Sequence, residues 1–288
     1  MRNITYNNIT DNVIKSIDGT PDTRLKEVLT AAISKIHELV KEIDLTHEEW
    51  EAAMNFLLRT GKISDEQRNE FILLSDLIGV SSLVDIIASK AAPGSSEQSV
   101  LGPFYRENAP FLEVGGDLIK DNEGDRVVFQ GYVRSTAGDP IAGALLDVWQ
   151  NAANGLYENI DSTQPDYNLR CRMLTDKNGF YCFSSICPLA YEVPDDGPGG
   201  EFMEATDRHC WRPAHLHARV SAEGYGDLVT EVFNTRDKYI DEDATFGVRE
   251  SLAIPFDRSP TNDELKRHQN LVQPFSMVDF DFILKPLE

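Results

Sequence analysis

The segment APGSSEQSVLGPF, residues 92–104, separates two parts of the chain with different sequence patterns. Before it, stretches such as DTRLKEVLTAAISKIHELVKEI (22–43) place apolar residues every third or fourth position, which predicts amphipathic helices. After it, short runs such as RVVFQGYVRS (126–135) alternate with turn signals, which predicts an antiparallel β-sandwich. The predicted fold class is therefore α+β, mainly β, with a helical domain over residues 1–100 and a sandwich over 101–288.

Composition narrows the class of protein. The 288 residues carry a formal net charge of −21, which disfavours binding to nucleic acid or to anionic membrane surfaces. Four cysteines without a C-x-x-C pair are typical of reduced thiols in an intracellular protein. There is no apolar run near the ~20 residues of a membrane span, and no apolar segment follows the first residues. The sequence predicts a soluble cytoplasmic protein.

One predicted strand carries two histidines. In CWRPAHLHARV (210–220), the side chains of His215 and His217 would share one face of the strand, and Leu216 and Ala218 the other. The pair is either half of a metal site or part of a polar row facing solvent. The H-x-H spacing alone leaves both readings open.

Two tyrosines lie in loops that follow predicted strands. Tyr157 is in NGLYENID and Tyr191 is in CPLAYEVPDDGPGG. Each could cover the core with its ring and point its hydroxyl at water. Alternatively, both could join the two histidines on one metal ion, and binding as phenolates near pH 7 would need a strongly Lewis-acidic cation such as Fe(III). Zinc prefers other ligands, and no H-x-D or H-x-E pair indicates a ferrous facial triad.

Several motifs together resemble the intradiol ring-cleaving dioxygenases, over nearly the whole chain. They are LGPFY (101–105), DVWQNAANGLY (147–157), QPDYNLRCRMLTDKNGFY (164–181), WRPAHLH (211–217) and DKYIDEDATFGVRESL (237–252). Residues 191–217 make the hydroxyquinol-cleaving members the nearest likeness within that family. The resemblance implies one non-haem Fe(III) per subunit, with four ligands: Tyr157, Tyr191, His215 and His217.

The resemblance also implies roles for residues around the metal. Arg212 would stabilise negative charge on the substrate ring, and Tyr191 would leave the metal as a phenol and take a substrate proton. The implied substrate pocket comprises Leu73, Asp76, Val100, Leu101, Gly102, Pro103, Phe104, Val193, Pro194 and Arg212. Asp76 is the informative member, because a third substrate hydroxyl could donate to a buried carboxylate.

Two positions depart from the family pattern. Glu231 stands where catechol-cleaving members carry a glutamine, and Thr245 stands where an apolar pocket residue is expected. Glu231 could accept a proton or repel an anionic substrate, so its role is open. Thr245 could widen the pocket wall or make it more polar.

The implied reaction uses O2 to cleave hydroxyquinol to 3-hydroxy-cis,cis-muconate, the enol of maleylacetate. The family also implies a homodimer formed by the helical region, with a phospholipid in an apolar tunnel between subunits. Three alternatives remain: a catechol or chlorocatechol 1,2-dioxygenase, a non-catalytic transthyretin-like ligand-binding sandwich, and a zinc hydrolase that uses the two histidines.

Overall fold

The computed structural model describes residues 3–65 and 68–287 and divides the chain into two compact units, Met1–Arg59 and Thr60–Glu288. The segment 92–104 lies inside the second unit, together with the two helices that precede it. Two helices that the sequence groups with the N-terminal region thus belong by their contacts to the unit that contains the sheets.

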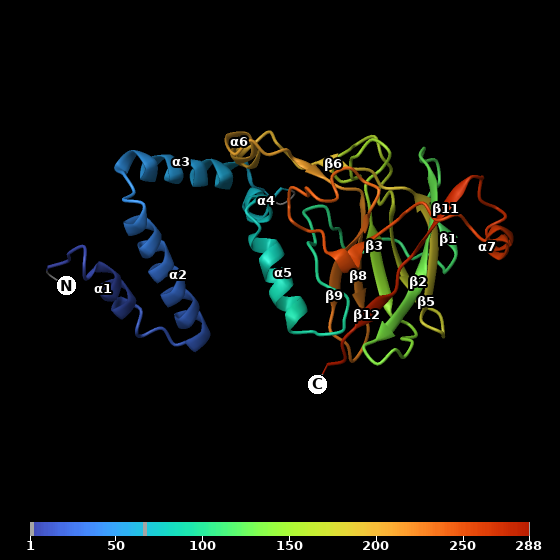
Figure 1. Ribbon diagram of the computed structural model, residues 1–288, viewed down its shortest axis with the longest axis horizontal. Coiled ribbons are helices and arrows are strands. Elements are labelled where there is room, and N and C mark those ends of the chain that lie inside the picture. The colour runs from blue at the N-terminus through green and yellow to red at the C-terminus, as the bar shows by residue number, and fades with distance from the viewer. Residues whose placement is uncertain (1–2, 66–67, 288) are drawn as a thin grey trace. The chain divides into compact units, whose positions relative to one another are not determined.

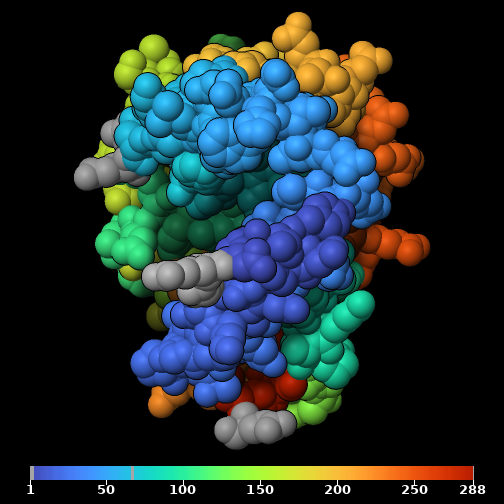
Figure 2. Space-filling view, turned by 90° about the vertical axis from the view of Figure 1, so that its left-hand side faces the viewer, coloured from blue at the N-terminus to red at the C-terminus, as the bar shows by residue number. Residues whose placement is uncertain are grey.

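The first unit consists of α1 (Ile9–Ser16), α2 (Thr23–Glu42) and most of α3 (His47–Ile63). Thr46 and Glu49 form the capping box at the start of α3: the Thr46 hydroxyl accepts from the Glu49 amide at 3.2 Å, and the Glu49 carboxylate accepts from the Thr46 amide at 2.9 Å. No side chain of α1 or α2 is buried. Figure 2 draws the side chains of these helices in blue, and the exposed apolar side chains of α2 are Leu25, Val28, Leu29, Ile36, Leu39 and Val40.

The second unit begins with two helices joined by a sharp turn. α4 (Glu70–Leu77) is capped by Asn69, whose side-chain oxygen accepts from two backbone amides, and α5 (Val80–Lys90) follows Gly79, which has a left-handed backbone conformation. Within the described ranges, no single helix is both long and apolar enough to cross a membrane; α4 and α5 meet that test only as a pair, across a 72° bend.

Two five-stranded sheets form the main part of this unit (Figure 1). One has the order β1-β5-β2-β11, with β12 also paired to β2; its strands are β1 (Gly116–Asp117), β2 (Arg126–Ser135), β5 (Phe180–Ile186), β11 (Phe275–Asp279) and β12 (Phe282–Leu284). The other has the order β10-β9-β8-β3-β4; its strands are β3 (Leu145–Trp149), β4 (Arg170–Leu174), β8 (His215–Ser221), β9 (Leu228–Asn234) and β10 (Ala253–Ile254).

The pairing is antiparallel in the centre of each sheet and parallel at several edges. Strands β2–β5, β3–β4, β3–β8 and β8–β9 pair antiparallel, as expected. In contrast, β1, β10, β11 and β12 each pair parallel to a neighbour. The fully antiparallel prediction is therefore corrected to a mixed arrangement, because short strands from long connections reach the edges in either direction.

Both sheets contribute to one hydrophobic core. Phe129 and Phe183 come from the first sheet, and Leu146 and Ala218 from the second, and all four belong to one buried cluster. Alternation along β8 sends Leu216, Ala218 and Val220 into this core. The opposite face of β8 is thereby left for the histidines.

The remaining elements lie in the connections. A two-stranded ribbon pairs β6 (Tyr191–Glu192) with β7 (Trp211–Arg212), and α6 (Pro198–Ala205) lies between them in the sequence. A short 3-10 turn (Glu250–Leu252) and α7 (Asn262–Arg267) occur later in the chain.

Candidate metal centre and substrate pocket

His215 and His217 lie side by side on β8, on the face that points away from the core. Their side chains are 2% and 1% exposed, so the reading of a solvent-facing polar row is wrong. The two Nε2 atoms are 3.1 Å apart. The Nδ1 atom of His215 is 2.7 Å from the Pro213 carbonyl oxygen, which cannot donate. His215 therefore carries its proton on Nδ1, and its Nε2 lone pair is free to bind a metal.

Both imidazoles are neutral, which is the state that a metal requires. Burial lowers the pKa of His215, and the nearby Arg212 charge lowers it further. Burial and the neighbouring His215 lower the pKa of His217 well below its usual value. The Nδ1 atom of His217 is buried and has no hydrogen-bond partner. Two close, neutral, water-excluded nitrogens fit a metal ion bound between them.

Tyr157 and Tyr191 border the same space. They are 1% and 7% exposed, and their ring centroids are 5.6 Å apart. The Tyr157 hydroxyl is 3.5 Å from Nε2 of His215, and the Tyr191 ring centroid is 5.6 Å from that of His215. Burial raises the pKa of both phenols, strongly for Tyr157. Without a metal, both therefore stay protonated, and a strongly Lewis-acidic cation would be needed to ionise them.

Arg212 is fixed opposite Tyr191 by the β6–β7 ribbon. The two residues are direct cross-strand partners. Arg212 is 2% exposed, and its Nη1 is 3.4 Å from Nε2 of His215. Burial opposes its charge, but Asp243 and Glu231 raise the pKa of Arg212 well above its usual value. A permanent buried cation thus lies beside the four candidate ligands.

Glu231 lies across the sheet from His217 and is completely buried. Its carboxylate, His215 and His217 have potential ligand atoms within 4.8 Å of one another. However, Oε1 accepts from Arg212 at 2.8 Å, and Oε2 accepts from the Ser99 hydroxyl at 2.6 Å. Burial raises the pKa of Glu231, but the Arg212 charge and the hydrogen bonds from Arg212 and Ser99 outweigh that effect and lower it. Glu231 is an ionised carboxylate whose oxygens are already engaged.

Part of the predicted pocket wall gathers around the tyrosines. Leu73, Phe104 and Val193 belong to the same buried cluster as Tyr157 and Tyr191. A cavity of about 350 Å³ beside the tyrosines is lined in part by Phe104, Val193 and Pro194. Val100 is also buried, and its backbone carbonyl lies near the His217 ring, where it partly opposes the lowering of the pKa of His217. In contrast, Leu101 is 39% exposed and Pro103 is also exposed, and neither belongs to the buried cluster that contains the tyrosines.

Gly102 has a backbone role that the pocket assignment did not include. Its φ is +73°, and a Cβ atom there would lie 3.2 Å from Cε1 of His217. Only glycine combines this left-handed conformation with such a close approach at no steric cost. The chain therefore packs directly against a candidate ligand at this position.

Asp76, on α4, is 3% exposed, and its Oδ1 has no hydrogen-bond partner. Burial raises the pKa of Asp76 to about 6, against the opposing effects of a Ser81 hydrogen bond and the Arg212 charge. A buried oxygen without a partner can accept a hydrogen bond from a bound molecule.

Thr245 is also buried, and its hydroxyl contacts Asp243 at 3.2 Å, so the Thr245 side chain is held by that carboxylate.

Sequence reasoning missed two side chains that hold the site. Trp149, on β3, is paired with His217 in the register and stacks on its ring, with centroids 4.8 Å apart and an interplanar angle of 6°. Asp243 accepts two hydrogen bonds from Arg212, at 3.0 and 3.2 Å. Trp149 lies in the motif DVWQNAANGLY and Asp243 in DKYIDEDATFGVRESL, but only strand register and tertiary contacts reveal which side chains they contact.

Comparison with known families covers most of the chain. A family model described as "Dioxygenase" matches residues 100–286, and one described as "Catechol dioxygenase N terminus" matches residues 22–96. A hydroxyquinol 1,2-dioxygenase from Rhizobium sp. is 44% identical over 95% of this chain and 93% of its own length. A 6-chlorohydroxyquinol 1,2-dioxygenase from Cupriavidus pinatubonensis is 37% identical over 99% of each.

Solved structures give the same family. Hydroxyquinol 1,2-dioxygenase from Pseudomonas putida DLL-E4 superposes with a TM-score of 0.91 at 38% identity, covering 98% of this chain and 99% of that one. Catechol 1,2-dioxygenase from Acinetobacter radioresistens superposes with a TM-score of 0.85 at 26% identity, covering 100% and 95%. The fold is thus shared with solved structures of hydroxyquinol- and catechol-cleaving enzymes, and the chain belongs to the intradiol ring-cleaving dioxygenases.

Proposed function

We propose that this protein is a non-haem Fe(III)-dependent hydroxyquinol 1,2-dioxygenase. The observation that carries the proposal is the convergence of two buried phenols and two buried neutral imidazoles on one space. Asp76 is near enough to this site for the Arg212 charge to lower its pKa. The hydroxyquinol-cleaving relatives, which match nearly the whole chain, support the same substrate class.

Fe(III) fits this donor set better than zinc does. Tyr157 and Tyr191 would supply two anionic phenolates, which offset most of a ferric charge in a region that excludes water. His215 and His217 would complete the set through Nε2. A carboxylate ligand is less favoured, because hydrogen bonds from Arg212 and Ser99 already occupy both oxygens of Glu231.

The side chains around the metal would then have separate roles in the reaction. Bound Fe(III) would acidify the substrate hydroxyls and make the ring reactive toward O2. Tyr191 would accept one substrate proton at its hydroxyl oxygen, and its raised pKa favours that protonated state once it leaves the metal. Arg212 would donate a hydrogen bond to negative charge on the ring, while Tyr157 and the histidines keep the ligand geometry. The expected product is 3-hydroxy-cis,cis-muconate, the enol of maleylacetate.

Asp76 is the proposed reason for preferring hydroxyquinol to catechol. A third hydroxyl on the ring can donate to the unpartnered Oδ1, whereas catechol would leave that oxygen without a partner. Sites built around a substrate hydroxyl discriminate strongly against analogues that lack it. Leu73, Phe104, Val193 and Pro194 would provide the apolar part of the pocket wall.

We also propose a homodimer formed through the helical N-terminal domain, with one iron per subunit in the sandwich domain. The exposed apolar side chains of α2 support this assembly, because a row of such residues is unusual on a monomer surface. A phospholipid between the subunits would cover the same kind of surface. Sedimentation at micromolar protein concentration tests the dimer, and a monomer there would contradict it.

Oxygen uptake by the iron-loaded protein tests the substrate. We expect fast uptake with hydroxyquinol and little with catechol, and Asp76→Leu should remove most of that preference. Asp85→Asn is a matched control, because the pKa of this half-buried carboxyl on α5 is also raised to about 6 by burial. A preference for catechol in the wild type would keep the iron site and reject the role of Asp76.

A further inference from the structure

The guanidinium of Arg212 is held by two buried carboxylates that approach different edges of its plane. Asp243 accepts from Nε at 3.0 Å and from Nη2 at 3.2 Å. Glu231 accepts from Nη1 at 2.8 Å and from Nη2 at 3.2 Å. Arginine has five N–H groups: one on Nε and two on each Nη. These contacts use the group on Nε, both groups on Nη2 and one on Nη1, so a single N–H on Nη1 remains.

The remaining N–H points toward the candidate metal site. Nη1 is 3.4 Å from Nε2 of His215. When that nitrogen binds a metal, its lone pair is no longer available to accept a hydrogen bond. The last N–H of Arg212 is then left for whatever occupies the space beside the ligands.

We propose that Asp243 is a positioning residue: with Glu231 it fixes the Arg212 guanidinium so that one N–H, and only one, is presented to the bound substrate. The proposal rests on the dioxygenase function above and adds a residue that the family resemblance did not single out. Arg212 then acts through a single directed hydrogen bond. It does not act as a free positive charge, because the two carboxylates give the three-residue cluster a net charge of −1.

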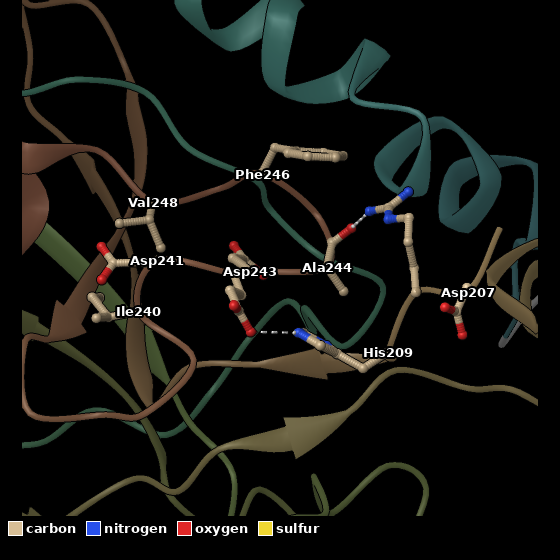
Figure 3. Close-up of a pocket in the computed structure, with 10 residues that line it drawn as sticks. Asp207, His209, Ile240, Asp241, Asp243, Ala244, Phe246 and Val248 are labelled. Atoms are coloured by element: carbon tan, nitrogen blue, oxygen red, sulfur yellow. Dashed lines mark hydrogen bonds and ion pairs between the residues drawn. The ribbon is translucent and has the colours of Figure 1, made fainter.

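Asp243 is itself fixed by the loop that carries it. Its oxygens accept from the backbone amides of Thr245 at 3.2 Å and Gly247 at 2.8 Å, and from the Thr245 hydroxyl. The same loop lines a separate cavity of about 700 Å³, where Figure 3 shows Asp243 between Asp241 and Ala244. Asp243 is 7% exposed. The loop thus holds the carboxylate by its own backbone, so the position of Arg212 does not depend on bound substrate.

A double-mutant cycle tests whether Asp243 acts through Arg212. We expect Asp243→Asn to lower kcat for hydroxyquinol by about 10- to 100-fold, the scale of a small misplacement of a catalytic group, with KM and iron content little changed. In an Arg212→Lys background, which cannot form the two paired contacts, Asp243→Asn should lower kcat no further. Losses that multiply in the double variant would overturn the proposal. An unchanged kcat in Asp243→Asn, or a change in KM alone, would also overturn it.

Glu264→Gln is the matched control. Glu264 accepts two hydrogen bonds from Arg258, at 2.8 and 3.0 Å, on α7 and away from the histidines and tyrosines. This variant also removes one carboxylate charge from an arginine pair. We expect the kcat of Glu264→Gln to match that of the wild type. An equal loss of kcat in Glu264→Gln and Asp243→Asn would mean that Asp243→Asn acts through general destabilisation.

A second measurement does not depend on turnover. In the iron-free protein, the Nε–H of Arg212 should exchange slowly with solvent by NMR, and Asp243→Asn should remove that protection. If the Asn variant does not fold, Asp243→Glu keeps the charge, moves the carboxylate by one methylene and should have the same effect. Fast exchange in the wild type would mean that Asp243 does not fix the Arg212 guanidinium, and it would overturn the proposal. Absence of oxygen uptake with any aromatic diol would reject the proposed function, while the exchange result would still decide whether Asp243 positions Arg212.

Discussion

Replacing Gly102 with alanine should damage the metal site through a single added carbon. Gly102 has φ +73°, a conformation that costs an L-residue about 1–2 kcal/mol. For a unit of this size, that cost lowers Tm by about 2–8 °C. In addition, the new Cβ would lie 3.2 Å from Cε1 and 3.6 Å from Nε2 of His217, so the ring must shift by a few tenths of an ångström. Stacking on Trp149 restricts that shift.

Gly143 provides a control that separates strain from contact. Its φ is +70°, nearly the same as that of Gly102, but no atom lies within 4 Å of a Cβ built there. Gly143→Ala should lower Tm by a similar amount and leave the iron site intact. Gly102→Ala should also weaken iron binding by about 10-fold or more, as changes in the support of a metal ligand commonly do.

The assay compares the two variants directly. Scanning calorimetry of the iron-free proteins gives the change in Tm caused by backbone strain. Iron titration, followed by the visible tyrosinate-to-iron band, gives the affinity for iron. If Gly102→Ala binds iron as tightly as Gly143→Ala and shows the same band, the packing of Gly102 against His217 has no functional importance and the reasoning is refuted.

Three further results are expected. Tyr157→Phe should weaken the visible band, to which Tyr191 would still contribute, and should bind iron more weakly; an unchanged spectrum would remove Tyr157 from the ligand set. Glu231→Gln should retain full iron stoichiometry but turn over more slowly, because it loosens Arg212; loss of iron would make Glu231 a ligand. Asp76→Asn should stabilise the iron-free protein at pH 8. The pKa of Asp76 is raised by burial from 3.8 to about 6, so the folded state favours the protonated carboxyl and wild-type stability falls as pH rises through that range. The gain should be at most about 3 kcal/mol and should disappear near pH 4, and an equal gain at both pH values would contradict the assignment.

Local sequence patterns were sufficient to predict the strand that carries the histidines. The alternation of Leu216 and Ala218 with His215 and His217 is a period-two pattern, and the structure has β8 there with the apolar residues in the core. The contact between Trp149 and His217 could not be predicted in this way. It depends on the register between β3 and β8, which no local pattern sets.

Two other features could not be predicted for related reasons. Arg212 and Asp243 are 31 residues apart, and their pairing depends on a loop that follows β9 and folds back over the ribbon. The parallel edge strand β11 pairs with β2 across more than a hundred residues, so its direction is set by the path of the intervening chain. Alternating apolar residues indicate that a strand exists, but they carry no information on its direction.

The candidate ligands differ in how firmly the backbone holds them. β8 is the middle strand of its sheet, with β9 on one side and β3 on the other, so the amide hydrogens of His215 and His217 should exchange with deuterium only when the whole unit unfolds. Tyr191 lies on a ribbon of two short strands, which is a weakly cooperative element, and should exchange through local opening at lower free energy. The two histidine ligands are thus held by a rigid strand, whereas Tyr191 is held by a backbone segment that opens more easily. Tyr191 is also the ligand expected to release the metal during each turnover.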